Sequence, residues 1–66
     1  NLLKKVKENP KEAISLCNQF KKMNSQGISL SSAEAIKTVS KRKNLSQADA
    51  EILSIYVIGL NCPEIF

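Results

Sequence analysis

The sequence predicts an all-α fold, a small bundle of three to four short helices near residues 2–8, 10–24, 32–42 and 47–58. Strand signals are nearly absent, since the chain has no alternating Val/Ile/Thr run and no Asn-Gly or Asp-Gly hairpin turn. Three positions, Asn9, Ser31 and Ser46, have the pattern of a helix N-cap. Apolar residues between these positions recur at spacings of three and four, which is the period of one helix face.

The length of the chain limits how stable it can be by itself. We expect residues 1–66 to form a single small helical domain, and the absence of an initiator Met indicates a piece of a longer protein. A domain of this size buries only about 60% of the surface that its unfolded chain exposes. A disulfide, a metal ion or a second chain usually supplies the missing stability.

The first two predicted helices meet at Asn9. Residues 2–8 predict a short first helix. The segment Asn9-Pro10-Lys11-Glu12 then combines an N-cap Asn, a Pro at the first helical position, and a Glu that can reach back to the cap. One face of this second helix is apolar, and Gly27 is expected to end it. The apolar face consists of Ala13, Leu16, Cys17, Phe20 and Met23.

The third predicted helix begins with a second capping box, Ser31-Ser32-Ala33-Glu34, in which Leu30 is placed to pack against Ala35. It ends in the basic run Lys41-Arg42-Lys43.

The fourth predicted helix begins at a third capping box, Ser46-Gln47-Ala48-Asp49, and is expected to end at Gly59. Its second half is apolar all round, which predicts burial on all sides. We therefore expect it to be the central helix of the fold or half of an interface. After it, Cys62-Pro63-Glu64 has the pattern of a further helix start.

The two cysteines, Cys17 and Cys62, are 45 positions apart. A disulfide between them is possible, but two cysteines fall below the density of a disulfide scaffold, and we expect two separate buried thiols. This interpretation predicts a reducing, intracellular location, in the cytoplasm. Two thiols without His do not complete a tetrahedral metal site, so no metal and no cofactor are expected. No apolar run is long enough to span a membrane.

The sequence does not predict an enzyme or a small-molecule substrate. It has no His and no Gly-rich phosphate loop, and Cys17 has no His or neighbouring base to activate it.

Charge is divided unevenly along the chain. All ten basic residues lie in the first 43 positions, so residues 1–44 carry a net charge of +7 and residues 45–66 carry −3. Three consecutive cations, Lys41, Arg42 and Lys43, lie at a predicted helix end, where they can contact a nucleic-acid backbone. Alternatively, cations at this position only complement the helix dipole.

The end of the chain carries a recognisable set of residues: Leu45-Ser46, Glu51-Ile52-Leu53, Ile55, Gly59-Leu60 and Glu64-Ile65. Residues 45–66 are similar to the start of a LuxR/NarL-type or sigma-region-4-type helix-turn-helix domain, in which a capped scaffold helix ends at a Gly-Leu pair. The sequence departs from this pattern at Pro63 and Phe66, and it stops before any recognition helix. Lys41 to Gln47 more loosely resembles the start of a phage-repressor helix-turn-helix.

Two functions follow from these patterns. The first is a non-enzymatic regulatory module that binds nucleic acid through its basic part, with the apolar last helix pairing with a second copy. Its predicted nucleic-acid contacts are Lys37, Lys41, Arg42 and Lys43. The alternative is a helical protein–protein interaction module, for oligomerisation or as an adaptor or regulator, in which the lysines only solubilise the chain. The predicted interface residues in either case are Ile52, Ile55, Tyr56, Ile58 and Leu60.

Overall fold

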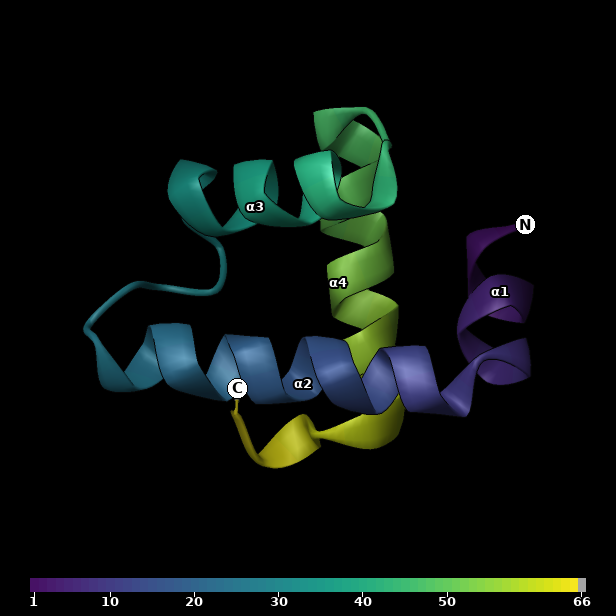
Figure 1. Cartoon of the computed structure of the whole chain (residues 1–66), viewed down its shortest axis with the longest axis horizontal. Helices are drawn as coiled ribbons and strands as arrows, with labels where there is room; N and C mark the ends of the chain where they lie inside the picture. The colour runs from purple at the N-terminus through teal and green to yellow at the C-terminus, as the bar shows by residue number, and fades with distance from the viewer. Residues whose placement is uncertain (66) are drawn as a thin grey trace.

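The last α-helix is the centre of the structure. The computed structural model describes residues 1–65, and Phe66 lies outside the described residues. The described chain contains the α-helices α1 (Leu2–Glu8), α2 (Pro10–Ser25), α3 (Ala33–Lys43) and α4 (Gln47–Asn61), followed by the 3-10 helix η1 (Pro63–Ile65). α4 packs against α1, α2, α3 and η1 (Figure 1). The all-α fold and the central position of the fourth helix are therefore confirmed.

The other helices lie around α4 at different levels. In Figure 1, α3 lies beside the first part of α4, while α2 runs crosswise near its far end and η1 lies beyond α2. α1 packs on the side of α4 opposite the loop that joins α2 to α3. α2 and α3 thus extend from α4 in the same direction, and residues 26–32 connect them at their outer ends.

A single apolar core holds the helices together. Phe20, the largest of the fully buried side chains, is 1% exposed. The predicted apolar face of α2 is buried along its whole length. The other buried apolar residues are Val6, Ala35, Ile36, Val39, Ala50, Leu53, Val57, Ile58 and Cys62.

Two of the three predicted N-caps need correction. Ser46 caps α4 as predicted, since its Oγ accepts from the backbone N–H of Asp49 at 3.1 Å. The cap of α3 is Ser32, whose Oγ accepts from Ala35 N–H at 3.2 Å, so the prediction of Ser31 was wrong by one residue. The reason is that Ser31 belongs to a turn closed by a hydrogen bond from Ser32 N–H to the Ser29 carbonyl.

Asn9 precedes α2 as predicted, but its side chain does not cap that helix. Its Nδ2 instead donates to the carbonyl oxygen of Lys5 at 3.1 Å, so it closes the end of α1. Glu12, which we expected to reach back to Asn9, turns towards α3 and contacts the side chains of Arg42 and Lys43.

Left-handed residues end α2 and α3. Gly27, with φ of 80°, follows α2 as predicted, and Ile28 N–H donates to the Met23 carbonyl at 3.0 Å in a Schellman arrangement. Asn44, with φ of 55°, ends α3 in a similar way. The predicted end of α4 at Gly59 was wrong, because the helix continues through Gly59 and Leu60 to Asn61. Gly59 is not left-handed, so it does not interrupt the helix.

Cys17 and Cys62 form a disulfide, so the prediction of two separate thiols was wrong. Their Cα atoms are 6.1 Å apart because α2 crosses α4 near its C-terminal end, a proximity that the sequence separation does not reveal. The disulfide joins the middle of α2 to the residue that follows α4, and both cysteines are buried. The prediction that the protein is located in a reducing compartment depended on free thiols. Because the two cysteines form a disulfide, that prediction loses its support.

Over the part of the chain that the structure describes, no helix combines the length and the apolarity that crossing a membrane requires.

Candidate interaction sites

One face of α4 is apolar and exposed, although the rest of the helix forms the core. The side chains of Ile52 and Ile55 are 42% and 51% exposed. Ala48 and Gly59 are also exposed, and the four positions follow one another at spacings of four, three and four. Residues at these spacings share one face of a helix. We call Ala48, Ile52, Ile55 and Gly59 the outer face of α4.

The predicted interface residues are therefore divided between surface and core. Ile52, Ile55 and Leu60 are exposed as an interface requires, and Tyr56 is half-buried against the core. Ile58 is 2% exposed and belongs to the core, so its prediction as an interface residue was wrong. The prediction that the second half of α4 is buried on all sides was also wrong, because α1, α2, α3 and η1 leave the outer face uncovered.

Gly59 lies inside α4 without a contact that requires glycine. A Cβ atom added there meets no atom within 4 Å of its position. Glycine inside a helix costs about 1 kcal/mol relative to alanine. No close contact within residues 1–65 therefore requires a glycine at this position.

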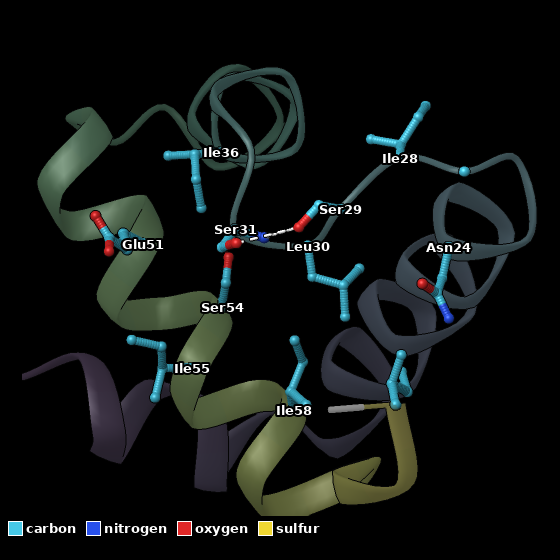
Figure 2. Close-up of a pocket in the computed structure, with 12 residues that line it drawn as sticks. Asn24, Ile28, Ser29, Leu30, Ser31, Ile36, Glu51, Ser54, Ile55 and Ile58 are labelled. Atoms are coloured by element: carbon cyan, nitrogen blue, oxygen red, sulfur yellow. Dashed lines mark hydrogen bonds between the residues drawn. The ribbon is translucent and has the colours of Figure 1, made fainter.

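A cavity of about 480 Å³ lies beside the outer face, between α4, the α2–α3 loop and the last residues of the described chain. Figure 2 shows Ile58 and Leu30 directed into it from α4 and from the loop. Its wall is mainly aliphatic, from Ile28, Leu30, Ile36, Ile55, Ile58 and Ile65. Ile55 therefore belongs to both the cavity wall and the outer face of α4.

The polar groups around the cavity are few. The hydroxyl groups of Ser29 and Ser31 form a hydrogen bond with each other, their oxygen atoms being 3.1 Å apart (Figure 2). This hydrogen bond helps to hold the α2–α3 loop. Ser54 donates to the Ala50 carbonyl of its own helix at 2.7 Å. Glu51 is the one charged residue in the wall, and its carboxylate forms no ion pair within residues 1–65.

Arg42, predicted to contact nucleic acid, is held by α2. Its guanidinium donates to Gln19 Oε1 and to Ser15 Oγ, both at 2.6 Å, and its Nε lies 3.7 Å from Glu12 Oε1. Glu12, Ser15 and Gln19 follow one another on α2 at spacings of three and four, so one side chain of α3 spans two turns of α2.

The remaining predicted nucleic-acid contacts are not equivalent. Lys43 Nζ lies 3.3 Å from Glu12 Oε1, so it also faces α2. Lys37 and Lys41 are exposed one turn apart on α3, and neither forms an ion pair within residues 1–65. The basic run is thus divided, with Arg42 and Lys43 turned towards α2 and Lys41 left exposed.

The chain matches one family model over residues 3–62, the Domain of unknown function (DUF8664). The chain belongs to this family. The matched residues include both disulfide cysteines, the contacts of Arg42 and the whole of α2, α3 and α4. No curated protein and no solved structure matches the chain significantly. The resemblance to helix-turn-helix domains stays a prediction, although α4 continues past the Gly-Leu pair where that resemblance places a helix end.

Sequence reasoning did not find the cavity. Ile28 and Leu30 were the available signal, because two large aliphatic residues in a short polar loop are unusual unless they cover or line something. The patterns of the helices could not show that α2 and α3 leave space between them, since this depends on how both cross α4.

Proposed function

We propose that this chain is a non-enzymatic protein-interaction module whose outer face of α4 pairs with the same face of a second copy. The observation that carries the proposal is the order of residues on that face: Ala48, Ile52, Ile55, Gly59, or small, large, large, small. When two such helices lie antiparallel about a two-fold axis, Ile52 of each copy faces Ile55 of the other. Ala48 then faces Gly59, so the surface is complementary to itself, as a two-fold interface requires.

The charges of α4 favour the antiparallel orientation. Its acidic residues, Asp49 and Glu51, both lie in its first half, and it has no basic residue. Parallel pairing would place the carboxylates of both copies at the same level, where like charges repel. Antiparallel pairing places them beside the uncharged second half of the partner helix.

The small residues at both ends of the face support close approach. Helices pack 8–10 Å apart, depending on the side chains between them. Gly59, which no contact within one chain explains, lets a partner backbone approach near its Cα atom. α4 has 15 residues, so the paired length is about 22 Å. Two helices in contact over this length bury less surface than a standard-size protein–protein interface. We therefore expect a weak, reversible dimer that forms at high protein concentration.

Sedimentation equilibrium of the unaltered chain and of two variants, each with one substitution, tests the proposal. Ile52→Asp places a charge on the outer face and should abolish association while the fold is kept, because the side chain is already exposed. Ile14→Asp is the matched control, since Ile14 is 55% exposed on α2 and lies outside the outer face. A strictly monomeric unaltered chain, or equal effects of the two substitutions, would contradict the proposal.

The proposed register has its own test. The test mixes two variant chains, one with Ile52→Lys and one with Ile55→Glu. In a mixed dimer the new lysine of the first chain faces the new glutamate of the second. The unchanged Ile55 of the first chain still faces the unchanged Ile52 of the second. We expect the mixture to associate more strongly than either variant alone. Equal association in all three samples would exclude this antiparallel register.

Binding of nucleic acid is a second candidate, supported by Lys37 and Lys41 on α3, which are exposed and form no ion pair with another residue of 1–65. Anisotropy of a labelled duplex over a salt series tests it. Replacing both lysines with Ala should flatten the salt dependence by up to about two units of slope, since each phosphate contact contributes about 0.9. No binding of the unaltered chain at low salt would leave only the interaction through α4.

A location inside the cell is not part of either proposal, because disulfides are typical of oxidising compartments.

A further inference from the structure

We propose that the cavity beside α4 binds a molecule with an aliphatic chain and a cationic head group, the chain lying among the isoleucines and the head group near Glu51. This inference does not require pairing through the outer face of α4, although Ile55 belongs to both sites. It rests on the size of the cavity, the chemistry of its wall and the charge at its edge.

The size of the cavity suits a small ligand. Ligand sites in proteins usually have volumes of about 300–1,000 Å³. The volume of about 480 Å³ lies within this range, although the whole domain has only 66 residues.

The wall of the cavity selects an aliphatic chain. Among residues 1–65 its large side chains are isoleucines and one leucine, and none of these described residues offers an aromatic ring on which a flat ligand would stack. No buried side-chain nitrogen or oxygen within residues 1–65 lacks a hydrogen-bond partner. No buried polar side chain of the described residues is therefore left without a partner for a ligand to satisfy, and we expect burial of apolar surface to supply most of the affinity.

The charge at the edge selects the head group. Among residues 1–65, Glu51 is the one charged residue in the wall, and it forms no ion pair with another of these residues. An ammonium group beside Glu51 gains a partner of opposite charge. A carboxylate or phosphate would instead be repelled by Glu51, and none of the described wall residues is a cation that could pair with it. The net charge of the whole chain is +4, which favours anions at the surface in general. A preference for cations thus distinguishes binding in the cavity from non-specific attraction.

Three probes with the same chain length test the proposal: decylammonium, decanol and decanoate, each below its micelle concentration. Amide chemical shifts of the ¹⁵N-labelled chain report where and how tightly each one binds. We expect decylammonium to bind more tightly than decanoate, with the largest shifts at Ile28, Ile36 and Ile58. Equal or tighter binding of decanoate would overturn the proposal, as would shifts centred on Ile52 and Gly59.

Two variants test the roles of the named residues. Glu51→Gln should weaken decylammonium binding by roughly two- to fivefold, as expected for an exposed charge pair, and leave decanol unchanged. Glu34→Gln is the matched control, because Glu34 is exposed at the start of α3 and does not line the cavity.

Ser31→Trp tests the cavity itself. It places a large side chain at the cavity wall from an exposed loop position and should weaken all three probes at least tenfold while the outer face of α4 keeps its residues. Ile52→Asp, which disrupts the proposed dimer, should leave probe binding unchanged. Loss of pairing and loss of probe binding are therefore separable, and unchanged binding by the Ser31→Trp chain would refute the site.

Discussion

Arg42 of α3 donates a hydrogen bond from Nη1 to Oε1 of Gln19 on α2, across 2.6 Å. The α3 helix packs mainly against α4, so this contact and its neighbours are the main polar link between the end of α3 and the side of α2. Arg42, which the sequence analysis predicted to contact nucleic acid, thus helps to position α3. α2 and α3 each contribute one residue, Asn24 and Ile36, to the wall of the cavity.

Replacing Arg42 with Ala should lower the free energy of unfolding by about 1–2 kcal/mol. Hydrogen bonds to a charged group contribute about 1.5–3 kcal/mol, and we reduce this range because the side chain is one-third exposed, at 33%. Urea unfolding followed by circular dichroism measures the change. Lys41→Ala is the matched control and should change stability by less than about 0.5 kcal/mol. Equal effects of the two substitutions would mean that the contacts of Arg42 with α2 do not stabilise the fold.

Removing the disulfide should destabilise the chain far more. The bond closes a loop of 45 residues between Cys17 and Cys62, for which chain entropy predicts about 4 kcal/mol. A single core of this size rarely supplies more than about 3–5 kcal/mol, so without the bond the chain should unfold at a urea concentration close to zero. The measurement compares urea midpoints of the unaltered chain with those of a Cys17→Ser/Cys62→Ser chain.

Treatment with a phosphine reductant provides the control for the disulfide experiment. It should shift the midpoint of the unaltered chain, after unfolding exposes the buried bond, and leave the doubly substituted chain unchanged. A midpoint that stays constant after complete reduction would show that packing alone holds α2 to the end of α4.

Local signals in the sequence were sufficient to predict that the helices form. They were insufficient to predict features that depend on contacts between distant parts of the chain. Capping at Ser46 and termination at Gly27 depend on neighbouring residues, so both could be predicted. The course of α4 through Gly59 could not, because it depends on Cys62 being held against α2 beyond the glycine.

The same limit applies to the candidate sites. The apolar character of α4 was visible in the sequence, but whether Ile58 or Ile55 lies in the core depends on which sides α1, α2 and α3 cover. The contacts of Arg42 join residues more than 20 positions apart, and no local pattern indicates such a pairing.

The cap of α3 can be assigned by a pair of substitutions. Ser32→Ala should cost about 1 kcal/mol of unfolding free energy, since it leaves the N–H of Ala35 without its side-chain partner. Ser31→Ala removes only the exposed contact with Ser29 and should have little effect. Denaturant midpoints distinguish the two, and a larger loss for Ser31→Ala would return the cap to the position that the sequence pattern first indicated.

Gly59→Ala should have opposite effects on folding and on pairing. Within one chain the added Cβ meets no atom within 4 Å, so the substitution should stabilise α4 by up to about 1 kcal/mol through helix propensity alone. In the proposed dimer the same Cβ points towards Ala48 of the second copy and holds the two backbones apart. Association measured by sedimentation should therefore weaken while the urea midpoint, measured at a protein concentration where the chain is monomeric, rises. Ala48→Gly is the reverse substitution on the same face, and it should lower the midpoint without weakening association. If Gly59→Ala strengthened both folding and pairing, Gly59 would not lie at a close helix contact, and pairing would have to use another part of α4.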